Sequence, residues 1–143
     1  MNQSRYQIVQ QSFSMALDEG WQDQSNYRFV GPEFDGLCHY INLAVDNVDT
    51  DLTVQDYAVV YLQTMQSTLH AFNVLKQGEL TLFDNNVAYW IVEQWQPEGD
   101  KKIILRCVFA LKKQKMHILS TSFTLRSWAK LYQSIDNMMR SFH

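Results

Sequence analysis

The chain has little of what usually divides or cross-links a polypeptide: its 143 residues include two prolines, five glycines and two cysteines. No Gly/Ser-rich break, repeat or low-complexity tract interrupts it, so we expect a single domain over residues 1–143. The two cysteines, Cys38 and Cys107, are too few for a disulfide framework. We expect both to be free thiols that pack as small buried hydrophobes.

Long apolar runs and clustered positive charge are also missing. No run approaches the roughly 20 apolar residues that cross a bilayer, and the start, MNQSRYQIVQQSF, has neither the basic nor the apolar region of a signal peptide. The protein is therefore expected in the cytoplasm. The net charge is −3 and the sequence predicts no basic face, which disfavours nucleic acid as a partner.

Motifs for catalysis or metal binding are missing as well. None of the four histidines has an HExxH or other paired ligand spacing, and no Gly-rich phosphate loop or nucleophile elbow occurs. Cys38 and His39 are neighbours on a predicted strand, so their side chains should point to opposite faces. Asp46, Asp49 and Asp51 could bind Ca²⁺ weakly, but acids in a solvated loop before a helix are the simpler interpretation. We expect no metal, no cofactor and no enzymatic activity.

What is present is typical of a globular domain with a substantial core, because 46% of the residues are apolar and 19% are charged. Apolar residues at helical spacing predict a helix over Thr53–Leu69, with Thr53 as N-cap and Asp56 close to a capping-box position. A second apolar stripe predicts a helix over Ser127–Arg140.

Alternating segments predict strands around these helices. Four strands joined by short turns should form an antiparallel meander between the helices: Asn73–Leu82, Val87–Trp95, Lys102–Leu111 and Met116–Phe123. Earlier in the chain, extended segments are expected over Phe13–Leu17, over Gln22–Val30, where Gly31 and Pro32 should end the strand, and over His39–Val45.

The central predicted strands carry apolar residues on both faces. In one of them, Cys107 and Phe109 point one way while Val108 and Ala110 point the other way. Both faces of the sheet therefore need cover. A helix is about 10 Å across and strands lie about 4.8 Å apart, so two helices cannot cover both faces of a five- or six-stranded sheet. Loops, a second copy of the chain or a client must shield the remainder.

Several runs of residues resemble one family. They are GWQDQSNYRF from residue 20, DYA from residue 56, WIVEQWQPEG from residue 90, LRCVFA from residue 105, and the terminal helix with Trp128. Together they are similar to the DcrB-like family, and more narrowly to the Eag chaperones of bacterial type VI secretion. The resemblance covers nearly the whole chain.

The resemblance implies a fold and a partner. The family is similar in fold to PsbP and Mog-type proteins, so it implies an α+β, α/β/α sandwich: an antiparallel sheet with helices packed on its faces. Its Eag branch is cytoplasmic and homodimeric. That branch binds the N-terminal transmembrane helices of effectors with a PAAR tip domain, often fused to Rhs toxins, and shields them before loading on the secretion spike. The missing signal peptide favours this branch over exported DcrB.

Carried over by position, the resemblance implies a client-binding groove that involves Asn26, Arg28, Tyr61 and Cys107. Phe109, which shares a strand face with Cys107, and Met65, on the apolar stripe of the first helix, complete the predicted groove. This chain departs from its relatives, which often carry aliphatic residues at the strand positions and Gln in place of Cys107. Cys107 as ordinary core is the alternative.

Two other functions stay open at this stage. The first is a generic protein-binding module of the same fold with another partner. The second is a small-ligand binder or an enzyme with its site in a sheet cavity, which would require a converging cluster of titratable residues.

Overall fold

The computed structural model describes residues 18–19, 26–49 and 51–142. Within them the chain forms six strands and two helices. In chain order these are β1 (Asn26–Phe34), β2 (Leu37–Asn47), α1 (Val54–Thr68), β3 (Asn73–Thr81), β4 (Val87–Trp95), β5 (Ile103–Lys112), β6 (Lys115–Phe123) and α2 (Leu125–Arg140). The predicted segment Phe13–Leu17 and the first part of the predicted strand from Gln22 lie outside the described residues.

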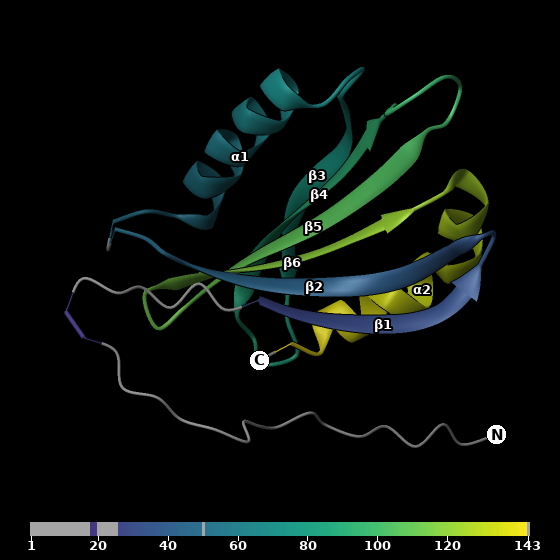
Figure 1. The fold of residues 1–143 in the computed structure, drawn as a ribbon. Helices are drawn as coiled ribbons and strands as arrows, with labels where there is room; N and C mark the ends of the chain where they lie inside the picture. Colours follow the sequence, from purple (N-terminus) through teal and green to yellow (C-terminus); the bar gives the residue numbers. More distant parts are fainter. Residues whose placement is uncertain (1–17, 20–25, 50, 143) are drawn as a thin grey trace, which may run out of the picture.

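The strands form one antiparallel sheet in the order β1-β2-β6-β5-β4-β3 (Figure 1). Short turns join neighbours along the chain, as the sequence predicts. In the β3–β4 turn, the Asp84 carboxylate accepts a hydrogen bond from the Asn86 backbone N–H at 3.0 Å, and Asn85 has a φ of 65°. Asn tolerates this left-handed conformation better than most residues, which explains the tight hairpin.

Both helices begin with a capping box. Thr53 caps α1 and exchanges hydrogen bonds with Asp56, which confirms the predicted start. The second helix begins at Leu125, earlier than the predicted Ser127. The reason is that Thr124 is the N-cap and Ser127 closes the box from the first turn.

The first strand does not end at Gly31 and Pro32, so this prediction is wrong. The strand continues to Phe34 through a register shift between Val30 and Glu33. Proline has no N–H to give to a neighbouring strand, which excludes it from the middle of a sheet but not from an edge strand or a bulge. Both exceptions apply to Pro32, because β1 is the edge strand of the described sheet and the register shift between Val30 and Glu33 includes this residue.

The helices pack on opposite faces of the sheet, which confirms the α+β sandwich (Figure 1). The α2 core includes Val108, Leu119 and Met139, and the α1 core includes Ala58, Cys107 and Phe109. Packing of α1 is mainly on β4 and β5, and packing of α2 is mainly on β5 and β6. On the α1 side, β2, β1 and the part of β6 beyond Met116, which is buried in the α1 core, therefore extend beyond the helix.

Candidate binding face on the α1 side of the sheet

The strand register brings the predicted site residues together on one face. One cross-strand row contains Asn26, Ala44, Ile118 and Phe109, and the next row contains Arg28, Asn42, Ser120 and Cys107. Because the side-chain period of a strand is two, both rows point to the same side of the sheet. The rows run from the exposed edge strand to the centre of the sheet, where α1 covers them.

We call the part of these rows on β1, β2 and β6 the open face: Asn26, Arg28, Asn42, Ala44, Ile118 and Ser120. Its two β1 residues are exposed and the other four are half-buried. Ala44 and Ile118 are apolar, while Asn42 and Ser120 can each donate and accept hydrogen bonds. The open face is therefore a mixed surface in which the apolar side chains of Ala44 and Ile118 lie beside four side chains that can form hydrogen bonds.

Arg28 lies flat at the outer end of the open face. Its Nε donates a hydrogen bond to Asn42 Oδ1 at 2.9 Å. The guanidinium also lies over the Tyr40 ring, 4.3 Å from the ring centroid, which is a cation–π geometry. These two contacts hold the long side chain along the sheet.

Tyr61 closes the inner end of the rows from above. Its hydroxyl donates a hydrogen bond to Glu93 Oε1 at 2.9 Å and lies 3.1 Å from Cys107 Sγ. Its ring meets Phe109 edge-on, with the ring centroids 5.1 Å apart. Burial raises the pKa of both the Tyr61 hydroxyl and the Cys107 thiol above their ordinary values, so both groups stay protonated near neutral pH.

Cys107 and Phe109 do not line an open groove, which corrects the prediction. They are 2% and 0% exposed, because α1 covers β5 at this point. Of the predicted groove residues, Asn26 and Arg28 belong to the open face, Tyr61 lies at the helix–sheet interface, and Met65 is half-buried on α1. Cys38 is exposed, so the expectation that both cysteines are buried is also wrong; both are free thiols.

Glu93 is the important residue that the sequence predictions missed. It lies on β4 under α1, fully buried, and its Oε2 has no hydrogen-bond partner. Desolvation by burial raises the pKa of its carboxyl group above the ordinary value. The side-chain alternation of β4 could have indicated this burial, because it places position 93 on the same face as Tyr89 and Ile91, among apolar neighbours.

On the other face, a buried ion pair fastens α2 to the sheet. Arg106 of β5 bonds Asp136 of α2, and Arg140 Nε donates to the second Asp136 oxygen at 2.8 Å. The Arg106 guanidinium also lies over the Trp90 ring, 5.2 Å from the centroid. Trp90 and Arg106 both belong to the sequence runs that resemble the family, and in the structure they contact each other.

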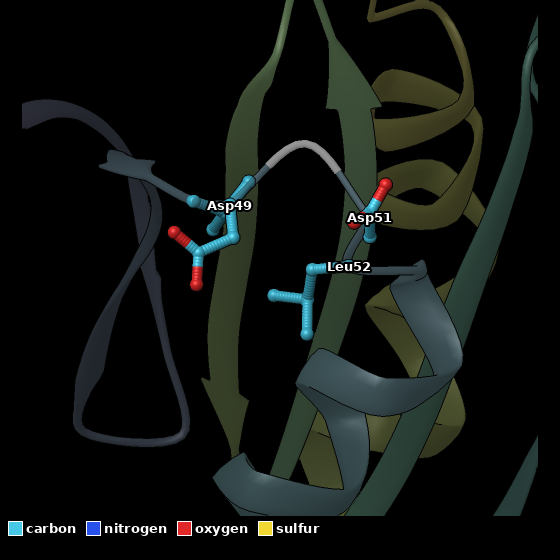
Figure 2. Close-up of a pocket in the computed structure, with 4 residues that line it drawn as sticks. Asp49, Asp51 and Leu52 are labelled. Carbon is cyan, nitrogen blue, oxygen red and sulfur yellow. The ribbon is translucent and has the colours of Figure 1, made fainter.

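The acidic loop before α1 has no geometry for a cation. Asp49 and Asp51 line a shallow opening with Val48 and Leu52, and their carboxylates point in different directions (Figure 2). Asp46 instead accepts a hydrogen bond from the Tyr57 hydroxyl at 3.0 Å. Within residues 18–19, 26–49 and 51–142, no group of three His, Cys, Asp or Glu side chains could hold a metal ion.

None of the helices in the described part of the chain is both long and apolar enough to cross a membrane.

Comparison with known proteins identifies one matching family and two solved structures with a similar fold. The DcrB family profile matches residues 13–141. No curated protein sequence matches significantly. Among solved structures, PA94 from Pseudomonas aeruginosa, a protein of unknown function, has 22% identity, covers 89% of this chain and 88% of its own, and has a TM-score of 0.76.

The solution structure of cyanobacterial PsbP from a Synechocystis species is similar at 11% identity, covering 90% of this chain and 97% of that one, with a TM-score of 0.54. Identities this low show a shared fold only. They confirm the prediction of a PsbP-like fold from the sequence.

Proposed function

The chain belongs to the DcrB family, and we propose that it is a binding protein rather than an enzyme, a chaperone that holds an apolar helix of a client on its open face. In its finer form, the proposal is a cytoplasmic Eag-type chaperone of type VI secretion. Its clients are then the N-terminal transmembrane segments of PAAR/Rhs-type effectors before they load on the secretion spike. The observation that carries the proposal is the mixed surface of β6, β2 and β1 beside α1.

The size of the open face suits one helix. Three strands about 4.8 Å apart span about 10 Å between the outer two, which is close to the diameter of an α-helix. A client helix on this surface would lie beside α1 and extend the helical layer over the part of the sheet that α1 leaves uncovered.

The chemistry of the open face suits a membrane-derived helix. Each large apolar side chain that moves from water into contact with the sheet contributes about 1.5–3 kcal/mol. Small residues such as Ala44 and Ser120 allow a helix backbone to approach closely, as they do between helices in membranes. Asn42 and Arg28 supply hydrogen bonds to Ser, Thr or backbone groups of the client, which would otherwise be buried without partners.

Binding of a designed peptide pair tests this proposal. One peptide is a helix of apolar residues with small residues and Ser at intervals; its control has the same length and helix propensity with charged residues in place of the apolar ones. We expect the purified protein to keep the apolar peptide in solution and to bind it in a titration followed by Trp fluorescence. Equal binding of both peptides, or of neither, would contradict the proposal.

A further inference from the structure

The buried carboxyl group of Glu93 has no cation to balance it. No ion pair of the described residues includes Glu93. Across the helix–sheet interface it meets Tyr61, whose hydroxyl bonds Oε1. An ionised carboxylate with one strong hydrogen bond in an apolar interior is very costly, whereas the neutral acid is tolerated.

The elements around Glu93 offer no compensating charge. The only charged residue of α1 is Asp56, exposed in its first turn, and His70 in the following loop is also exposed. In register on β5, Leu105 opposes Glu93. The neighbouring Cys107 thiol, a weak donor, stays protonated because burial raises its pKa, and Arg106 points to the other face, where it bonds Asp136.

On β3, the residue opposite Glu93 is Val74. Lys76 and Glu79 further along that strand are exposed, and Glu79 accepts a hydrogen bond from Gln55 at 2.6 Å. On β4 itself, the next side chain on the same face is Trp95, whose indole Nε1 is buried without a hydrogen-bond partner. Every ionisable group near Glu93 is therefore neutral, negative, exposed or bonded elsewhere.

The helix that Tyr61 fastens to Glu93 covers the inner ends of the two rows. Beneath it lie Ile91, Cys107 and Phe109, all nearly or fully buried. Cys107 and Phe109 continue the rows that start at Arg28 and Asn26, so removal of α1 from the sheet would lengthen the open face without any change of strand pairing.

We propose that α1 is a lid on the sheet and that Glu93 is its latch: the neutral acid keeps the lid closed, and ionisation of Glu93 lets α1 lift and expose Cys107 and Phe109. The lid stands on the contacts of α1 alone. Its use, an apolar floor enlarged for a client helix, rests on the proposed function above.

Labelling of Cys107 tests the lid without any client. In a Cys38→Ser background, Val92→Cys places a reference thiol on β4 that faces α2, at a position 4% exposed. The two thiols lie in separate tryptic peptides, residues 107–112 and 77–101, so mass spectrometry reads each labelling rate in the same sample. Both thiols react faster at higher pH because more thiolate forms, and dividing the Cys107 rate by the reference rate reduces this common effect. The ratio then reports opening of the α1 side alone.

We expect this labelling ratio to rise about tenfold or more between about pH 5 and about pH 8.5, the range over which a buried acid of raised pKa ionises. In the matched variant Glu93→Gln, which keeps the shape but cannot ionise, the ratio should stay flat. A flat ratio in the parent protein would overturn the latch, and parallel labelling of both thiols would overturn it too, because the whole domain would then be opening. If Glu93→Gln does not fold, the ratio in the parent protein alone decides.

Discussion

Arg28 at the edge of the sheet and Cys107 beneath α1 occupy the same cross-strand row, joined by Asn42 and Ser120. These two residues are far apart in the sequence and differ completely in exposure. Their alignment means that the exposed surface and the buried core of this face are one continuous floor, divided only by the position of α1. The use of the proposed lid, a larger floor for a client helix, depends on this continuity.

Removal of one partner of the Tyr61–Glu93 hydrogen bond should lower the free energy of unfolding more when the other partner is still present than when it has been replaced as well. Tyr61→Phe leaves the buried acid without a donor and is expected to lower the free energy of unfolding by about 1–3 kcal/mol. In a Glu93→Leu background the same change should cost much less. Urea unfolding of the four proteins measures this, and equal costs in both backgrounds would show that the two residues are not coupled.

Stability should depend on pH through Glu93. Its carboxyl pKa is raised in the folded protein above the ordinary value of 4.5, so the folded state holds the proton more tightly than the unfolded state. The stabilisation is present below the unfolded pKa and is lost as pH rises through the folded pKa.

The urea midpoint of the parent protein should therefore fall from about pH 5 to about pH 8, and that of Glu93→Gln should fall less. Identical slopes for the two proteins would show that another group controls the pH dependence.

The ion pair of Arg106 and Asp136 should be sensitive to loss of one partner. Asp136→Ala leaves a buried guanidinium without its carboxylate and is expected to cost about 3–5 kcal/mol. Arg126→Ala is the control, because its side chain is 80% exposed in a pair with Asp35 and should change stability little. Thermal melts that show similar losses for both variants would contradict the assignment of Arg106 and Asp136 as the fastening of α2.

The alternation of the strands allowed much of the fold to be predicted. Positions 107 and 109 lie on one face and positions 108 and 110 on the other, as the sequence predicted; the structure shows that the first pair faces α1 and the second pair faces α2. The end of β1 could not be predicted, because Pro32 is excluded from a sheet centre but not from an edge, and edge position is a property of the whole sheet.

The position of α1 over Cys107 could not be predicted for a similar reason. Strand alternation tells which face a residue occupies but not which part of that face a helix covers, and here α1 lies over β4 and β5. Glu93 was overlooked because a glutamate in an apolar strand suggests an exposed position, whereas its neutral form and the Tyr61 hydroxyl make burial tolerable.

A second copy of the chain is expected in solution. The edge strand β1 leaves apolar residues such as Val30, which is 66% exposed, without cover from the described part of the chain. Light scattering during gel filtration should give about twice the monomer mass of 16.8 kDa at micromolar concentration. A mass equal to one chain would contradict the proposed homodimer.

The most direct test of the open face compares two adjacent residues of β2. Ala44 lies on the open face opposite Ile118, and Val45 lies on the other side of the sheet opposite His117; both are half-buried. We expect Ala44→Arg to weaken binding of the apolar helical peptide at least about tenfold, or about 1.4 kcal/mol, while Val45→Arg leaves it nearly unchanged. Circular dichroism must show that both variants are folded. Folded Ala44→Arg that binds like the parent protein would contradict the central claim that this face holds the client.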